Sequence, residues 1–338
     1  MNTTEDLDSF LFWGLHDQGV TLGYLMVNIV LFIIGVFVIF LNAVVFYSMT
    51  REHPSDDDVS NYIIANLSVS DMITGMFVIY SVAYNLVNFQ SKVECYIRLG
   101  FVHFFSQSSV FHLVLLTADR YVKIIFPYKH PIIFKRMSIV YVSAIIWCFS
   151  FLYGALPIMG WHKELIPGGV PCSYLGTLSN GFMHLTLVTF FSPSFMLNVM
   201  YAHIFVVARK HQRAIHNLEV GPDSRGFDKK SWKLTKTVVI ISGAYIACWT
   251  PLGIVIMLYL YGYLRGMTSE ETSSYIVYSS IPAYCNALVN PIIYAFKLPV
   301  VKKYYKRLFC SCVCRPVRHG SPHGTSVSNH QTSSYPHQ

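Results

Sequence analysis

Long apolar stretches recur along the chain, with short polar segments between them. Each is long enough to cross a bilayer as a helix, which takes about 20 predominantly apolar residues. Lipid offers no partner for backbone N–H and C=O groups, so such spans must be helical. The pattern therefore predicts an all-α fold, a seven-transmembrane helix bundle, with spans near 24–49, 61–87, 95–126, 137–160, 181–209, 233–262 and 273–297.

The composition agrees with a lipid environment. The chain is 53% hydrophobic and 12% charged, whereas soluble domains carry about 25% charged residues. With the amino terminus outside, only four of the 25 Lys and Arg residues lie on outer segments: Lys92, Arg98, Lys163 and Arg265. This split obeys the positive-inside rule. The net charge of +8 thus indicates membrane orientation and contact with anionic lipids rather than nucleic-acid binding.

The boundaries of the spans divide the chain into three parts. Residues 1–23 are expected outside, with a glycosylation sequon at Asn2. Residues 24–298 form the membrane domain. Residues 299–338 comprise a basic amphipathic stretch, Pro299–Phe309, and a cytoplasmic tail. The protein is expected to be a multi-pass protein of the plasma membrane.

Polar side chains inside spans are costly and indicate function. Asn42 lies in the first span, Asp71 in the second, and Asn286 and Asn290 in the seventh. For Asn42, hydrogen bonding between helices is an equally good interpretation. A lone carboxylate near mid-membrane needs a partner, so we expect Asp71, Asn286 and Asn290 to form a cluster that holds Na⁺ or ordered water. Apart from that ion, the sequence indicates no cofactor and no metal site.

A set of motifs follows the spans in order, and together they resemble the rhodopsin-like (class A) G-protein-coupled receptors. The resemblance covers about residues 24–312. Within the class, the chain most resembles the adenosine and lysophospholipid receptors. The motifs are Asn42, Asp71, Asp119-Arg120-Tyr121, Trp147, Pro193 with Tyr201, Cys248-Trp249-Thr250-Pro251, and Asn290-Pro291-x-x-Tyr294.

The resemblance implies a switch on the inner side of the membrane. Asp119 would hold Arg120 in the inactive receptor. In the active one, Arg120 would meet the carboxyl-terminal helix of a heterotrimeric G protein, with Tyr201 and Tyr294 closing over it. Pro251 permits a kink in the sixth span, and a ligand pressing on Trp249 would swing that span outward. Arrestin and receptor kinases are further expected partners.

One position departs from many members of this family. They carry an acid at the start of the sixth span that pairs with the arginine of the third span. Here that position is Ser231, and Lys229, Lys230 and Lys233 surround it. We therefore expect the lock between the helices to be weak, and signalling without ligand to be appreciable.

The cysteines fall into groups. By resemblance, Cys95 and Cys172 form the disulfide that holds the second outer loop over the pocket, on the oxidising side of the membrane. Cysteines at 310, 312 and 314 follow the amphipathic stretch and suit palmitoylation, since their spacing is not that of a zinc site. The thiols are Cys310, Cys312 and Cys314.

The ligand is less well defined. Segments such as Leu156–Trp161 resemble those of adenosine receptors, and Tyr174 could stack on a purine. However, the family's purine-binding Asn corresponds to Ile256, and its seventh-span His to Tyr284. Losing such a partner costs about 1–3 kcal/mol for each unpaired group. Opsins carry a lysine in the seventh span, and the corresponding position here is Tyr284, so the chain does not resemble an opsin at that position.

Arg98 provides an alternative. Lysophospholipid receptors place an arginine here that grips phosphate, although Arg98 could equally extend to solvent. An amine ligand would need an acid at Val102, and we expect none in the outer half of any span. A lipid whose carboxylate or phosphate head group binds Arg98 would place its tail among apolar side chains. The expected pocket comprises Arg98, Val102, His103, Ser106, Tyr174, Leu185, Leu252, Ile256 and Tyr284.

Other classes of protein fit the chain poorly. A seven-span transporter or channel would show inverted repeats or broken helices, and neither is evident. A membrane enzyme would need converging groups, yet His103, His112 and His184 do not approach Asp71 at ligand spacing. The sequence therefore predicts a receptor for a nucleoside or lipid rather than an enzyme, and the resemblance implies that its signalling modulates cyclic AMP.

Overall fold

The computed structural model describes residues 22–51, 59–87, 91–163, 172–217 and 243–313. Within them, seven helices are long and apolar enough to span a membrane, which confirms the predicted all-α bundle. They are α2 (Leu22–Arg51), α3 (Val59–Val87), α4 (Lys92–Ile125), α6 (Arg136–Ala155), α8 (Asn180–Asn217), the sixth span (Gly243–Leu260) and α10 (Ser269–Lys297).

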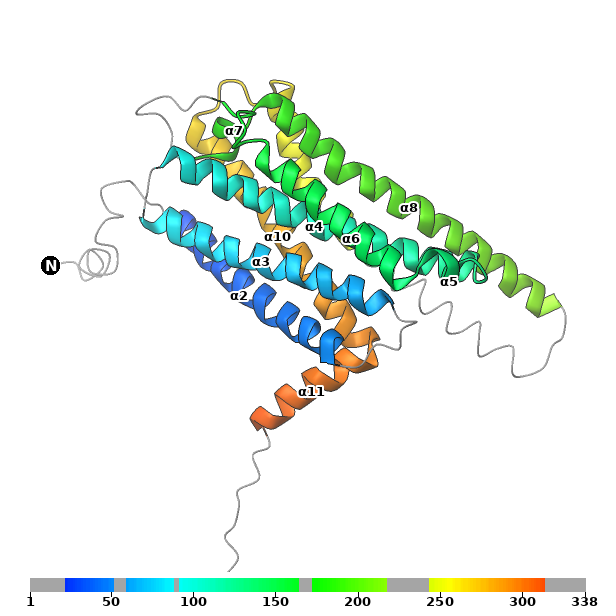
Figure 1. The fold of residues 1–338 in the computed structure, drawn as a ribbon. Coiled ribbons are helices and arrows are strands. Elements are labelled where there is room, and N and C mark those ends of the chain that lie inside the picture. Colours follow the sequence, from blue (N-terminus) through cyan, green and yellow to red (C-terminus); the bar gives the residue numbers. More distant parts are fainter. Residues whose placement is uncertain (1–21, 52–58, 88–90, 164–171, 218–242, 314–338) are drawn as a thin grey trace, which may run out of the picture.

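Three shorter helices lie at the two ends of the bundle (Figure 1). The one-turn helix α7 (Tyr174–Thr177) lies at the outer end, in the second outer loop. At the inner end are α5 (His130–Ile133) and α11 (Pro299–Val313). The basic stretch after the seventh span is thus helical, as expected, and α11 packs against α10 and α2.

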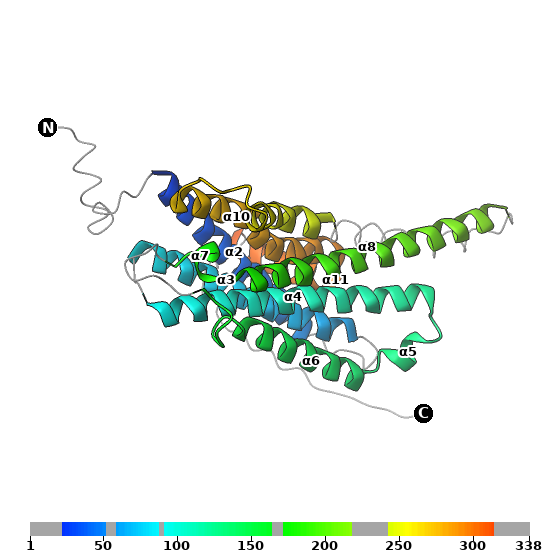
Figure 2. The same cartoon turned by 90° about the horizontal axis from the view of Figure 1, so that it is seen from above.

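The ends of the spans differ from those predicted from hydropathy. Helix α8 has 38 residues, a length of about 57 Å, and its inner end projects beyond the neighbouring helices (Figure 2). Its last turns, from Arg209 to Asn217, are polar, so a hydropathy criterion stops short of them. The helix α4 starts at Lys92 because Ser91 caps it, accepting a hydrogen bond from the Glu94 N–H.

The bundle carries apolar side chains outside and polar ones inside, as lipid requires. Large apolar residues such as Phe37, Phe151 and Phe195 are exposed on its surface. Asp71 and Gln107, in contrast, are buried between helices. This arrangement places the functional groups of the spans in the interior, where neighbouring helices supply their partners.

Candidate functional site

The inner end of α4 carries the predicted switch, and its carboxylate has more partners than expected. Asp119 is fully buried, and it accepts a hydrogen bond of 2.8 Å from the Ser60 hydroxyl of α3. His130 Nε2, on α5, lies 2.8 Å from the other carboxylate oxygen. Arg120 Nε is 3.7 Å from Asp119. Asp119 therefore connects α3, α4 and α5, and its hold on Arg120 is the weakest of these contacts.

Two hydroxyl contacts join α4 to α8 near the same end. The Thr117 and Tyr201 hydroxyls are 2.6 Å apart. Tyr121 Oη lies 2.7 Å from His203 Nδ1. The buried hydroxyl of Tyr294 has no hydrogen-bond partner among the described residues. Tyr201 is thus bonded to Thr117 here, and its closure over Arg120 remains a prediction for the active state.

A polar cluster occupies the middle of the bundle. The Asp71 carboxylate accepts hydrogen bonds from the Ser109 hydroxyl (2.6 Å) and from Asn290 Nδ2 (3.1 Å). Asn42 Nδ2 instead donates to the Ala287 carbonyl at 3.0 Å, joining the first and seventh spans. Asn286 is buried, but within the described ranges no hydrogen bond links it to Asp71. The cluster therefore forms around Asp71 and Asn290, with Ser109 as a member that the sequence did not indicate.

Trp249 lies between two groups of packed side chains. Its ring stacks on Phe190 at 4.2 Å between centroids. It packs against an inner cluster that includes Leu113, Tyr201 and Tyr245. It also packs against an outer cluster that contains Ile256. A ligand that displaces Trp249 would therefore change the packing of both clusters, and Pro251 follows two residues later in the same span.

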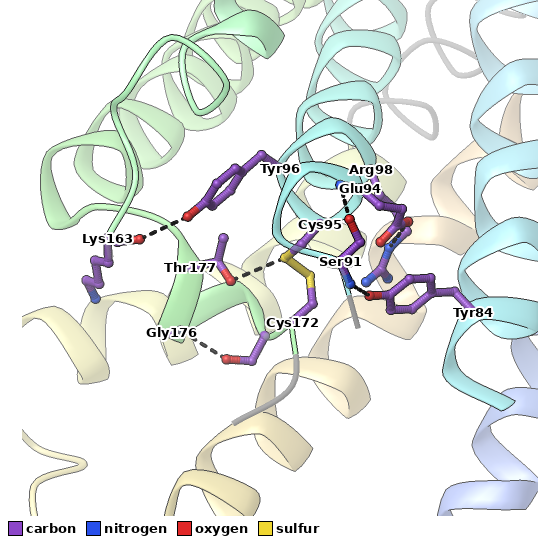
Figure 3. The surroundings of a disulfide bond; sticks show 11 residues. Tyr84, Ser91, Glu94, Cys95, Tyr96, Arg98, Lys163, Cys172, Gly176 and Thr177 are labelled. Atoms are coloured by element: carbon purple, nitrogen blue, oxygen red, sulfur yellow. Dashed lines mark hydrogen bonds and ion pairs between the residues drawn. A yellow bond between two sulfur atoms is a disulfide. The ribbon is translucent and has the colours of Figure 1, made fainter. Parts of the chain in front are cut away.

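The outer end is covered by the second outer loop. A disulfide joins Cys95 of α4 to Cys172, as predicted, and brings α7 against the bundle (Figure 3). Leu175 and Leu178 of this loop are buried with Leu252 and Ile256 in one apolar cluster. The loop thus packs directly onto side chains of the predicted pocket.

Tyr174 lies at the centre of this contact. Its hydroxyl is 3.2 Å from His103 Nε2, and the two rings stack at 5.5 Å. His103 Nδ1 is bonded to the Leu99 carbonyl at 2.7 Å. Burial raises the pKa of the Tyr174 phenol well above its ordinary value. The hydroxyl therefore stays protonated and the side chain is a neutral aromatic group, which packs against the same apolar cluster as the partly buried Leu185.

Lys163 anchors the loop to the sixth span. Its ammonium donates to the Leu175 carbonyl at 2.9 Å and to the Tyr259 hydroxyl at 3.1 Å. The same ammonium lies 5.0 Å from the centre of the Tyr259 ring. The ammonium of Lys163 thus joins the second outer loop to the sixth span. The resemblance implies that this span moves when the receptor is activated.

Arg98 is neither an unpaired cation nor a solvent-exposed one. Its Nε is 3.1 Å from Glu94 Oε1, and its guanidinium lies 4.1 Å from the centre of the Tyr84 ring (Figure 3). The side chain is 8% exposed. The expectation that no acid lies in the outer half of a span was therefore wrong, because α4 begins early enough to include Glu94.

The remaining predicted pocket residues lie on α4 and α10. Ser106 is buried and Val102 is half-buried. Tyr284 packs with apolar residues of the first and second spans. The predicted set is thus divided between a region around Tyr174 and a second region around Arg98.

The sequence matches a family model described as "7 transmembrane receptor (rhodopsin family)" over residues 41–294. That match spans the switch, the polar cluster, Trp249 and the disulfide. The chain belongs to the rhodopsin family of seven-transmembrane receptors. Membership implies a multi-pass plasma-membrane receptor that couples to a G protein and is not an enzyme.

Similar receptors bear the names of two kinds of ligand. The adenosine receptor A2b of Gallus gallus is 24% identical over 76% of this chain and 81% of its own length. The adenosine receptor A3 of Ovis aries is 24% identical over 89% and 93%. The histamine H2 receptor of Homo sapiens is 27% identical over 80% and 74%. These relatives agree on the class of receptor and differ in the ligand they are named for.

Several functional contacts of this receptor escape motif reasoning. Ser60, His130 and Glu94 belong to none of the motifs above, and Lys163 lies in a loop. Glu94 is four residues before Arg98, a spacing that brings the two side chains to one face of a helix, so that pair could have been found. The partners of Asp119 could not, because they come from separate helices.

Some predicted positions lie outside the described residues: Asn2, Ser231 and Cys314. The backbones of Cys310 and Cys312 belong to the last turns of α11. Glycosylation and palmitoylation therefore stay predictions.

Proposed function

We propose that this receptor is activated by a neutral, nucleoside-like small molecule that binds beneath the second outer loop, against Tyr174. The observation that supports a neutral ligand is the pairing of Arg98 with Glu94, which compensates the charge of this buried arginine. Lys163, the other cation nearby, is occupied by a carbonyl and the Tyr259 hydroxyl. The ligand would lie among Leu185, Leu252 and Ile256 and press on Trp249.

The groups available to such a ligand are aromatic rings and neutral hydrogen-bonding atoms. Tyr174 offers a ring face, as base-binding proteins do. Gln107 on α4 is buried, and its side-chain oxygen has no partner among the described residues. A buried amide oxygen is costly to leave unpaired, so a ligand N–H would be favoured there. These features suit a nucleoside better than a protonated amine, for which Val102 gives no counter-ion.

The second candidate is an anionic lipid bound through Arg98. One terminal nitrogen of Arg98, Nη2, is buried and without a hydrogen-bond partner in the described structure, which favours an additional acceptor. The phosphate would have to compete with Glu94 for the guanidinium. Arginine binds phosphate well through its fork of donors, so this competition is the point that an experiment must decide.

The test is a G-protein assay in cells that express the receptor, with nucleosides and lysophospholipids as probes. Cyclic AMP is the proposed output. Tyr174→Ala should reduce nucleoside potency about tenfold or more, because a stacked base loses its ring. Tyr174→Phe keeps the ring and serves as the matched control.

The paired substitution Arg98→Gln with Glu94→Gln separates the two candidates. It removes both charges together, so no buried charge is left unpaired. A nucleoside response that survives it supports the neutral pocket. A lysophospholipid response that it abolishes would instead establish the anionic lipid as the ligand.

Further features complete the proposed receptor. The amino terminus lies outside with a glycan on Asn2, and thioester-linked lipids on Cys310, Cys312 and Cys314 attach α11 to the inner leaflet. Sodium is bound at Asp71, where the carboxylate and the Ser109 hydroxyl are oxygen ligands of the kind that hard cations prefer. Arrestin and receptor kinases act on the inner face, as elsewhere in this class.

A further inference from the structure

Two arginines from separate helices rest on two touching tyrosines at the inner end of the bundle. Tyr47 of α2 and Tyr304 of α11 meet edge to face, with 5.6 Å between ring centres. The Arg51 guanidinium lies 5.3 Å from the Tyr47 ring centre. The Arg307 guanidinium lies 5.9 Å from that of Tyr304. We refer to these four residues as the arginine–tyrosine cluster.

The helix α11 is held firmly enough for this cluster to be a fixed feature. Val301 and Tyr305, one turn apart, are buried in the inner apolar core. The Tyr305 hydroxyl donates to the Leu41 carbonyl of α2 at 2.8 Å. Because Arg51 ends α2 and Arg307 follows Tyr304 by three residues, the two cations are brought to one aromatic pair from 256 positions apart in the sequence.

The positive charge of the cluster is not compensated by acids in the described part of the chain. Neither Arg51 nor Arg307 takes part in an ion pair there, and both side chains are exposed. Rings attract a guanidinium through their faces, but they leave its N–H donors available. Two guanidinium groups, each over one ring of the same tyrosine pair and each with donors available, can serve a group that carries more than one negative charge.

The position of the cluster indicates where that group comes from. Tyr47 is 49% exposed, on the same helix as the exposed Phe37 and Phe40, so its ring borders the lipid. The arginine distribution places Arg51 on the inner side of the membrane. The inner leaflet is the one that carries anionic lipids. The cluster thus lies where apolar tails give way to inner-leaflet headgroups.

We propose that the arginine–tyrosine cluster binds the phosphorylated headgroup of a polyanionic inner-leaflet lipid, a phosphoinositide, and thereby fastens α11 to α2. Arginine suits this task because its planar fork donates two parallel hydrogen bonds to phosphate. This site is distinct from the outer pocket and does not depend on the identity of the activating ligand.

The chain provides a matched control for this proposal. Lys302 and Lys306 are exposed on the same helix, one turn apart. In helical projection they fall on the flank of α11 away from Tyr304 and Arg307, beyond the buried Tyr305. Substituting either pair, Arg51 with Arg307 or Lys302 with Lys306, removes two positive charges. Only the first pair removes charges from the cluster.

The experiment is native mass spectrometry of the purified full-length receptor in detergent, with phosphatidylinositol bisphosphate or phosphatidylserine added. The Arg51→Gln/Arg307→Gln receptor should bind the bisphosphate about 30-fold more weakly, because each basic residue removed near the membrane surface weakens binding about fivefold. The Lys302→Gln/Lys306→Gln receptor should change by less than about threefold. Tyr304→Phe keeps its ring and should bind like the unmodified receptor.

Three results would overturn the proposal. Equal losses in the two glutamine variants would mean that the positive charge of α11 acts diffusely. Phosphatidylserine binding as tightly as the bisphosphate would remove the requirement for phosphate. Undiminished bisphosphate binding by the arginine variant would remove the site. The thermal unfolding midpoint of each variant, measured in parallel, distinguishes a loss of binding from a loss of fold. Should the glutamine variant fail to fold, Arg51→Lys/Arg307→Lys keeps both positive charges and removes only the planar guanidinium groups.

Discussion

At the scale of single residues, the contacts of Asp119 determine how firmly Arg120 is held at the inner end of the third span. Asp119 and Arg120 are adjacent, so an ion pair between them is expected from the motif. The structure gives Asp119 two shorter contacts, to Ser60 and His130, from helices that no motif connects. The restraint on Arg120 is correspondingly loose, at 3.7 Å. The switch is thus defined by neighbours in space as much as by the motif.

The contact distances predict how Asp119→Asn will behave. A long ion pair with a partly exposed arginine contributes about 1 kcal/mol or less. Its loss should therefore raise basal signalling at most about fivefold. Guanine-nucleotide exchange in membranes, normalised to the amount of receptor at the surface, measures this directly.

His130→Ala is the contrasting substitution in that experiment. Without the imidazole, one oxygen of the buried carboxylate loses its donor, and Arg120 is the nearest cation that can approach it. Basal exchange should fall rather than rise. A larger increase for His130→Ala than for Asp119→Asn would mean that α5, and not the charge of Asp119, restrains the receptor.

At the scale of helices, hydropathy predicts the spans well and their ends poorly. Apolar runs identify seven helices because lipid requires both properties together, length and apolarity. The ends depend on local groups instead. Ser91 starts α4 early enough to place Glu94 inside the helix, and this one turn changes the interpretation of Arg98. The polar end of α8, to Asn217, is helical without being apolar.

Close contacts between helices are a second feature that hydropathy does not reveal. Gly100 of α4 faces Gly154 of α6, and a side chain on Gly100 would overlap the Gly154 carbonyl. Small residues let membrane helices approach closely. The pair therefore fixes the separation of the third and fourth spans.

Gly100→Ala should destabilise the receptor, because two backbones must move apart to admit one methyl group. Such overpacking costs about 1–3 kcal/mol, which corresponds to a fall of roughly 2–10 °C in the thermal unfolding midpoint. Gly243→Ala is the matched control, since no atom of the described residues lies within 4 Å of the added methyl. If the two variants unfold at the same temperature, the contact between α4 and α6 is not limiting for stability.

At the scale of the whole molecule, the outer and inner regions are joined through Trp249. The loop that covers the pocket packs with Leu252 and Ile256, and Trp249 packs against that cluster and the inner one. Lys163 ties the same loop to Tyr259 of the sixth span. A ligand that displaces Tyr174 or Leu175 would therefore act on the sixth span from above. Motifs predict the inner half of this route, whereas the outer half depends on a loop fold that no periodic pattern encodes.

The balance between the two states of the molecule should depend on Ser231. This position, at the start of the sixth span by comparison with the family, lies outside the described residues, and an acid there would pair with Arg120. Ser231→Glu should lower basal nucleotide exchange, because a new ion pair favours the inactive packing of the third and sixth spans. Ser231→Gln is the matched control, because glutamine has the length of glutamate and no charge.

Two outcomes would show that the missing acid does not set the resting state. One is equal activity of the two variants. The other is a basal signal in the unmodified receptor, at good surface expression, that is no higher than in cells lacking the receptor. A reduction confined to Ser231→Glu that disappears in combination with Arg120→Gln would identify Arg120 as the partner, since the effect then requires both charges.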